Sequence, residues 1–179
     1  GEESFGYLPG DYVRDKDGIS SCCLFAETTA WARENGKSIW DLLLDIYVEY
    51  GLYKERLINV VRKGPEGAAE IRKMMEDYRN NPPMEIAGTK VAKIYDWQAL
   101  TSTDMYTGKK TPLEPQKSNV LQFFLADGSK ISVRPSGTEP KIKFYFSVNA
   151  PLASRPAFEK TNSELETRID NIIKDMKLV

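Results

Sequence analysis

The sequence contains no histidine, and this absence excludes several kinds of catalytic site from the chain. Histidine is the general base of Ser-His-Asp and Cys-His nucleophiles, and it is the commonest ligand in mixed zinc sites. None of these sites can be built from the 179 residues present. Long apolar runs are missing as well. No stretch approaches the ~20 apolar residues of a membrane-spanning helix, so we expect no membrane partner.

Cysteine is scarce, and the two residues present, Cys22 and Cys23, are neighbours. Adjacent cysteines rarely reach disulfide geometry, and a free cysteine in an apolar helical stretch behaves as a small hydrophobe. We therefore expect both thiols in a core. The acidic first residues lack the basic and then apolar layout of a signal peptide. Two unpaired thiols without such a signal predict a cytoplasmic protein.

Charge is distributed unevenly along the chain. Residues 1–51 carry four Lys or Arg and ten Asp or Glu, whereas residues 52–179 carry 21 and 16. A break of this size predicts two regions that meet near Gly51. The basic residues of the second region are dispersed and form no dense stripe. This pattern argues against nucleic acid as a partner and favours a small anionic ligand.

The first region is predicted to be helical. Residues 19–35 are apolar nearly all round, which is typical of a buried helix. A second helix begins at Ser38, with Asp41 as the partner in a capping box, and ends at Gly51. The two helices have no sheet beside them and the chain lacks an initiator Met, so we expect them to be the end of a larger α/β domain. Their apolar surface, residues 19–50, also predicts self-association.

The second region is predicted to be an α+β domain, a mostly antiparallel sheet with helices on one face. Asp127-Gly128 is a strong hairpin signal. Residues 98–118 read as one long polar loop. The predicted strands are residues 55–63, 89–96, 120–126, 130–134 and 141–148, and the predicted helices begin at Gly64 and Ser154.

The loop between the last two strands has the sequence RPSGTEP and begins at Arg134. A phosphate group is bound by a planar cationic fork, hydroxyl donors and backbone N–H groups around one concavity. Arg134 offers the fork, Ser136 and Thr138 offer hydroxyls, and Gly137 allows close approach of the backbone. Strand alternation places Lys130, Ser132 and Arg134 on one face of their strand, and if Lys143 of the next strand lies on that same solvent face, it points back toward Arg134. The alternative is a tight polar turn with scattered surface cations.

A second candidate lies at the start of the chain, in the sequence GEESFG. The side chains of Glu2 and Ser4, on a loop flanked by glycine, suit the hydroxyl groups of a sugar. An acidic chain end is the simpler explanation of the same residues. The following Arg14 and Lys16 are, by composition alone, most typical of a solvated run of charges.

The segment SVRPSGTEPKIK, residues 132–143, resembles the phosphate-binding loop in the C-terminal domain of the α-D-phosphohexomutases, the phosphoglucomutases and phosphomannomutases. GEESFG resembles the sugar-recognition loop in the third of that family's four domains, and residues 14–18 resemble the segment after it. The form of GEESFG is typical of a phosphoglucomutase or a dual-specificity enzyme rather than an aminosugar mutase. The resemblance covers essentially the whole chain. It implies that residues 1–51 end the third domain and that residues 52–179 are the complete fourth.

The resemblance implies an isomerase of carbohydrate metabolism, an intramolecular phosphotransferase. The family interconverts hexose 1-phosphate and 6-phosphate through a hexose 1,6-bisphosphate. It uses a phosphoserine in its first domain and Mg²⁺ on an Asp-rich loop in its second, and neither motif occurs here. We therefore expect no catalytic residue and no metal ligand in this chain, no activity of the chain alone, and a partnership with the missing N-terminal domains.

The resemblance also assigns roles to individual residues. The family's phosphate-binding positions correspond here to Arg134, Ser136, Gly137, Thr138 and Lys143. Its sugar-binding positions correspond to Glu2 and Ser4, with Lys16 adding charge nearby. The alternatives are a free-standing phosphosugar-binding module without catalysis, and an interaction or scaffold domain.

Overall fold

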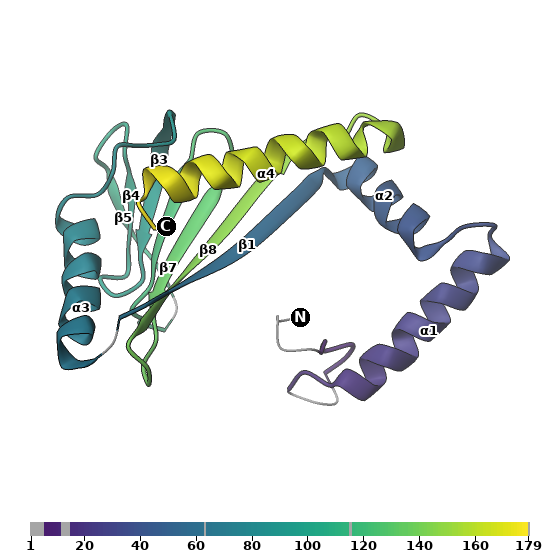
Figure 1. Ribbon diagram of the computed structural model, residues 1–179, viewed down its shortest axis with the longest axis horizontal. Helices are drawn as coiled ribbons and strands as arrows, with labels where there is room; N and C mark the ends of the chain where they lie inside the picture. The colour runs from purple at the N-terminus through teal and green to yellow at the C-terminus, as the bar shows by residue number, and fades with distance from the viewer. Residues whose placement is uncertain (1–5, 12–14, 63, 115, 179) are drawn as a thin grey trace.

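A computed structural model of the protein describes residues 6–11, 15–62, 64–114 and 116–178 (Figure 1). A broad antiparallel sheet is covered by helices on one face, and two helices from the start of the chain extend away from it. In chain order the elements are α1 (Gly18–Glu34), α2 (Ile39–Tyr50), β1 (Leu52–Val61), α3 (Gly64–Asn80), β2 (Glu85–Ile86), β3 (Thr89–Asp96), β4 (Thr101–Asp104), β5 (Lys110–Pro112), β6 (Leu121–Leu125), β7 (Lys130–Pro135), β8 (Lys141–Ala150), the 3₁₀ helix η1 (Arg155–Ala157) and α4 (Phe158–Asp175).

The strands form one sheet in the order β1-β8-β7-β6-β3-β4-β5, with β2 paired to β3 outside this path. The neighbouring strands are antiparallel, which confirms the predicted α+β class. The predicted turn at Asp127-Gly128 joins β6 to β7. Gly128 has φ +85°, a left-handed conformation that favours glycine, and the amide of Asn149 donates a hydrogen bond of 3.1 Å to its carbonyl oxygen.

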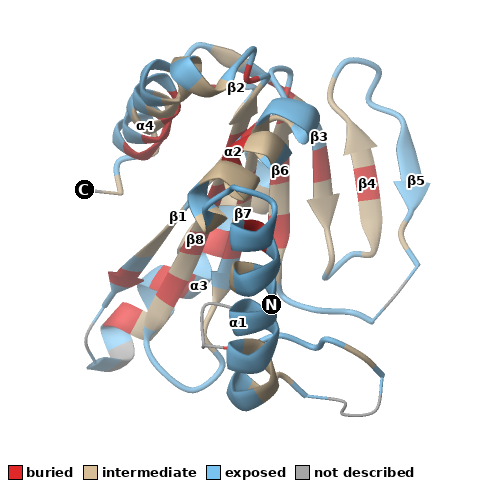
Figure 2. Ribbon diagram, turned by 90° about the vertical axis from the view of Figure 1, so that its right-hand side faces the viewer, coloured by how far each residue is buried: buried red, intermediate tan, exposed pale blue. Residues whose placement is uncertain are grey.

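The core is formed by residues of the sheet and of the helices that cover it. Figure 2 shows buried residues along the central strands and on α4. Strand β8 alternates buried and half-buried residues along its length, as expected for a strand with one face packed. Helices α3 and α4 both pack on the buried side, so the prediction of helices on one face is confirmed. The core residues from these three elements are Ile71 and Met75 of α3, Ile142, Phe144, Phe146 and Val148 of β8, and Leu165, Ile169, Ile172 and Ile173 of α4.

The prediction of one long polar loop over residues 98–118 is wrong. The segment contains β4 and β5, which extend the sheet beyond β3. Thr101 pairs with Asp96 of β3, and Thr103 pairs with Lys110 of β5. These short strands carry polar residues and lack an apolar alternation, so their pairing depends on backbone hydrogen bonds that composition does not reveal.

The prediction that the first helix is buried is also wrong. In α1 the buried residue is Ala32, whereas Phe25 and Trp31 are 60% and 55% exposed. Cys22 and Cys23 are exposed free thiols, not core residues. The physical reason is that apolar residues surround α1 on all sides, while among the described elements α2 is its main neighbour. A helix that is apolar all round needs more cover than one neighbour provides.

Helix α2 begins as predicted. The side chain of Ser38 accepts a hydrogen bond from the backbone N–H of Asp41, and the Asp41 carboxylate accepts one from the Ser38 N–H. Leu44 is buried, whereas Ile46 remains half-exposed. Self-association through these helices stays a prediction.

Contacts with the end of the chain hold α2 against the sheet domain. Phe158, at the start of α4, stacks on Tyr47 and meets the ring of Trp40 edge-on at 4.9 Å between centroids. Arg155 donates hydrogen bonds to the carboxylates of Asp41 and Asp45. The bond from Arg155 lowers the pKa of Asp45, so this carboxylate stays charged in neutral solution.

Candidate functional site

The RPSGTEP loop joins β7 to β8 and is closed by its own hydrogen bonds. The N–H of Ser136 donates to the carbonyl oxygen of Lys141 at 2.8 Å. The N–H groups of Thr138 and Glu139 both point at the Ser136 hydroxyl oxygen, at 3.4 and 3.3 Å. Two backbone amides thus converge on one oxygen, which is the arrangement that receives an oxygen of an anion in backbone anion sites.

Glu139 is the acidic residue of this loop. Its carboxylate accepts a hydrogen bond from the ammonium group of Lys141, and this bond, with the charges of Lys141 and Lys143, lowers the pKa of Glu139. The carboxylate is therefore ionised at neutral pH and offsets part of the positive charge of Lys141. The guanidinium of Arg134 lies on the strand before the loop.

The strand register places Arg134 of β7 directly beside Lys143 of β8. Both lie on the face of the sheet opposite the core, because Val133 and Phe144 on either side are fully buried. This outer face is the one that strand alternation predicted for the two cations. Arg134 is exposed, whereas Lys143 is half-buried with its Nζ 5.9 Å from the centroid of the Tyr145 ring.

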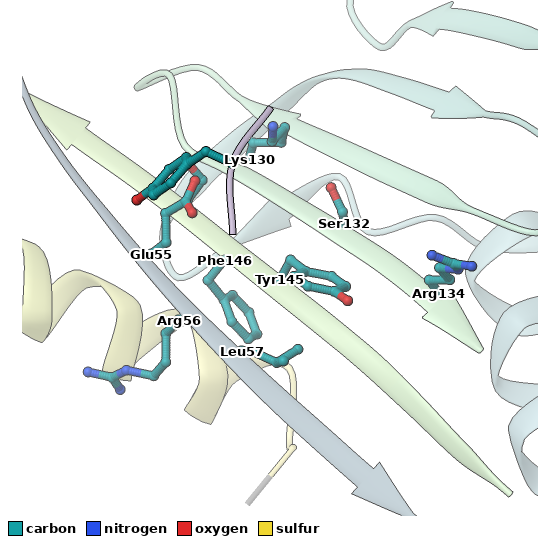
Figure 3. Close-up of a pocket in the computed structure, with 10 residues that line it drawn as sticks. Glu55, Arg56, Leu57, Lys130, Ser132, Arg134, Tyr145 and Phe146 are labelled. Atoms are coloured by element: carbon teal, nitrogen blue, oxygen red, sulfur yellow. The ribbon is translucent and has the colours of Figure 1, made fainter. Parts of the chain in front are cut away.

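A cavity of about 740 Å³ lies on this outer face (Figure 3). Ser132, Arg134 and Tyr145 are on its β7 and β8 side, and Glu55 comes from β1. Arg56 lines the edge of the cavity but points toward α4, where it pairs with Glu166 and Asp170. The lining residues are Tyr7, Glu55, Arg56, Leu57, Lys130, Ser132, Arg134, Tyr145, Phe146 and Ser147.

The loop lines a different cavity, of about 550 Å³, between itself and α3. Ser136, Gly137 and Thr138 face this space together with Ile71 and Arg72 of α3. The structure therefore brings Arg134 and Lys143 together on the outer face, and Ser136, Gly137 and Thr138 together in the loop. The predicted phosphate-binding residues are thus divided between two adjoining cavities.

The N-terminal candidates are described in part. Glu2, Ser4 and Arg14 lie outside the described residues. Lys16 is half-buried, with its Nζ 3.6 Å from the carboxylate of Asp15. The backbone N–H of Asp17 donates to the carbonyl of Tyr7, and Tyr7 lines the outer cavity. The segment that carries Lys16 is thus tied to a residue of the same cavity as Arg134.

Comparison with known proteins gives matches over both regions. The model of the phosphoglucomutase/phosphomannomutase C-terminal domain matches residues 57–151, and that of the family's alpha/beta/alpha domain III matches residues 1–50. The chain belongs to the phosphoglucomutase/phosphomannomutase family. The family predicted from SVRPSGTEPKIK and GEESFG is confirmed.

Individual relatives agree with this assignment. The chain is 38% identical over 148 residues to the phosphoglucomutase of Staphylococcus haemolyticus, and 39% identical over 152 residues to that of Staphylococcus aureus strain N315. These alignments cover 83% and 84% of the chain and 27% of each relative. The chain thus spans about a quarter of the length of these relatives.

Among solved structures, the open form of parafusin, a phosphoglucomutase from Paramecium, aligns with a TM-score of 0.46 at 14% identity. The alignment covers 91% of this chain and 28% of that one. The family assignment rests on the two family models and not on this weak likeness.

Magnesium, which the family resemblance implies for the whole enzyme, has no fitting donor set in the described part of this chain. No group of three or more Cys, Asp or Glu side chains is found there in an arrangement that could hold a metal ion. Asp11, Asp15 and Asp17 form no such group within these ranges. Magnesium prefers several oxygen ligands in near-octahedral geometry, so we assign it no role in these residues.

The helices described here are also too short or too polar to cross a membrane.

Sequence reasoning gave no role to several residues that line the outer cavity. Lys130 and Ser132 of β7 and Tyr145 of β8 lie on the same outer face as Arg134, and the cavity that they line marks them as ligand-facing. Glu55 follows from the register of β1 against β8, where it pairs with Ser147. The position of Tyr7 at the cavity could not be predicted from the sequence, because it depends on contacts between residues far apart along the chain.

Proposed function

We propose that this chain supplies the substrate-binding part of a phosphohexomutase that interconverts hexose 1-phosphate and 6-phosphate through a 1,6-bisphosphate. Residues 1–51 then belong to the third domain, and residues 52–179 belong to the fourth. The phosphoserine and the Mg²⁺ belong to the other domains. The observation that supports this best is the cross-strand pair of Arg134 and Lys143 at the foot of a loop whose amides converge, in a chain that matches two models of the family.

The role proposed for this part is to hold the phosphate group that is not reacting. Arg134 offers a fork of N–H donors and Lys143 adds a point charge beside it. Ser136, Gly137 and Thr138 supply the hydroxyls and the flexible backbone of the loop. Binding energy far from the reacting atoms orients the substrate, which raises the rate of a step performed elsewhere.

The hexose hydroxyls are assigned, by the family resemblance, to Glu2 and Ser4, with Lys16 adding positive charge. In the proposed reaction, no side chain of this chain accepts or donates the phosphoryl group. Its residues bind and orient only.

A second candidate function is a phosphosugar-binding module without catalysis. The docking of α2 on η1 and α4 favours it, since these contacts join the first region to the sheet domain within the described chain. The two candidates share the phosphate site. They differ in whether the remaining domains of a mutase are needed for its biological role.

The phosphate site is tested by replacing Arg134. The Arg134→Gln variant should bind inorganic phosphate about tenfold more weakly than the wild type, because a charge-assisted hydrogen bond is lost at an exposed site. An NMR titration of backbone amides measures both the affinity and its location. In the wild type the largest shifts should fall on residues 134–139.

The control for this titration is Arg33→Gln, which removes an exposed arginine on α1. It should leave the affinity for phosphate unchanged. Shifts spread evenly over all surface lysines and arginines, or an equal loss in both variants, would contradict the proposed site.

We further expect that the chain alone does not convert glucose 1-phosphate into glucose 6-phosphate. The physical reason is that neither a phosphoserine motif nor an Asp-rich metal loop occurs in the sequence. A coupled assay of glucose 6-phosphate formation, with Mg²⁺ and glucose 1,6-bisphosphate added, measures this. Turnover that follows the protein through purification would show that a catalytic group has been overlooked.

A further inference from the structure

A chain of hydrogen bonds crosses the outer face of the sheet and ends at the cavity. The indole N–H of Trp97 donates to the side-chain oxygen of Gln122 at 2.9 Å. The side-chain nitrogen of Gln122 donates to the hydroxyl oxygen of Ser132 at 3.0 Å. Trp97 follows β3, Gln122 lies on β6 and Ser132 on β7, so the chain connects three successive strands to the residue that lines the cavity.

The chemistry of these groups fixes the direction of the chain. An indole N–H is a donor only, so the oxygen of the Gln122 amide must face Trp97. The amide nitrogen then faces Ser132, and because that nitrogen is a donor, the Ser132 oxygen must accept. A hydroxyl that accepts from one partner keeps its own proton for another. The Ser132 hydroxyl oxygen therefore accepts from Gln122, and the hydroxyl proton is available for donation to a second partner.

The surroundings of Ser132 suit a negatively charged acceptor. Lys130 and Arg134 precede and follow it on the same face of β7, each roughly 6–7 Å away along the strand. Lys143 stands beside Arg134 on β8. Along β7 the cavity wall thus presents a cation, a hydroxyl donor and a second cation (Figure 3).

The opposite wall differs in charge. Glu55 of β1 is the acidic residue among those that line the cavity, and a carboxylate accepts hydrogen bonds but does not donate them. Strand β8 lies between β7 and β1, so an anionic group bound at β7 is separated from Glu55. The Glu55 carboxylate can then accept hydrogen bonds from hydroxyl groups of the same ligand. A phosphate ester of a polyhydroxy compound matches both walls.

We propose that Ser132 is a phosphate-binding residue, and that Trp97 and Gln122 are positioning residues that hold its hydroxyl as a donor to a phosphate oxygen. This inference rests on the proposed function, since it places the same phosphate between Arg134 and Ser132. The phosphate then lies at the rim of the outer cavity beside the loop, and Ser132 reaches it from the outer-cavity side.

The first test removes the donor. Ser132→Ala should raise the dissociation constant for inorganic phosphate about fivefold, because one hydrogen bond to a charged acceptor is lost at a half-buried site. Ser163→Ala, on the exposed side of α4, is the matched control and should leave the constant unchanged. The indole N–H resonance of Trp97 shows in each sample whether the hydrogen-bond chain and the fold are intact.

The second test reverses the direction of the hydrogen bond between residue 122 and Ser132. In Gln122→Glu, one carboxylate oxygen accepts from Trp97 and the other accepts from Ser132, so the hydroxyl proton turns away from the ligand. The added charge also repels phosphate. Together these effects should raise the dissociation constant about tenfold or more. In the Ser132→Ala background the same change should have a clearly smaller effect, because repulsion alone remains.

Each outcome decides something. Equal effects of Gln122→Glu with and without Ser132, or an unchanged affinity in Ser132→Ala, would overturn the role of Ser132. If Arg134→Gln still weakens binding in that case, the proposed phosphate site survives. If Arg134→Gln has no effect, or if the wild type binds no phosphate, both the site and this inference fail.

Discussion

Replacing Phe144 by alanine should lower the free energy of unfolding by about 3–5 kcal/mol. Phe144 is fully buried at the centre of β8, with its ring centroid 6.4 Å from those of Tyr78 and Phe146. Truncation removes the ring from a site closed by α3 and by its neighbours on the sheet, and leaves a cavity that these elements cannot fill without moving. Chemical denaturation of the purified variant measures the loss.

The matched control is the next residue, Tyr145, whose side chain lies on the outer face. Tyr145→Ala should cost about 1 kcal/mol, because its ring is half-exposed and has the Lys143 ammonium group 5.9 Å from its centroid. Equal losses in the two variants would mean that the two faces of β8 are packed alike, and the assignment of the outer face to ligand binding would then fail.

The contrast between these neighbours could be read from the sequence. Residues 141–148 alternate strictly between apolar and polar or amphipathic side chains, and a period of two assigns each residue to a face without further information. The same rule placed Arg134 and Lys143 on one face. The short Asp127-Gly128 turn predicted that the two strands it joins, β6 and β7, are neighbours.

Elements without a repeating apolar pattern could not be predicted in this way. Strands β4 and β5 are short and polar; β4 pairs with the edge of β3, and β5 pairs with the edge of β4. The exposure of α1 depends on which partners are present, and its sequence shows only that it is apolar. The place of Tyr7 at the outer cavity depends on its bridge to Asp17, the residue before α1. Each of these features is fixed by long-range contacts.

The division of the predicted phosphate ligands between two cavities follows from the end of β7. Arg134 is still within the strand and keeps the outward direction that alternation gives it. Ser136 has left the strand, and its N–H donates to Lys141 across the turn. Only Pro135 lies between Arg134, whose side chain lines the outer cavity, and Ser136, which lines the cavity beside α3. A phosphate that contacts both must sit at the rim between the cavities.

A glycine in α3 has a structural role that helix propensity does not reveal. Gly67→Ala should destabilise the protein by about 1–3 kcal/mol, although glycine to alanine inside a helix is normally stabilising. A Cβ atom at Gly67 would lie 2.5 Å from the backbone carbonyl carbon and oxygen of Arg62, a distance at which the backbone must move. Chemical denaturation measures the change in stability.

The same substitution should also reach the phosphate loop. The N–H of Arg62 donates to the carbonyl oxygen of Pro140 at 2.9 Å, so a displacement of Arg62 moves the end of the loop. We expect the amide resonances of Thr138 and Glu139 to shift in Gly67→Ala even without ligand. Gly137→Ala is the control for stability, because a Cβ there meets no atom within 4 Å, and it should change the free energy of unfolding by less than about 0.5 kcal/mol. A more stable Gly67→Ala protein with unshifted loop amides would show that α3 and the strand before it have room to separate, and that the loop is positioned by β7 and β8 alone.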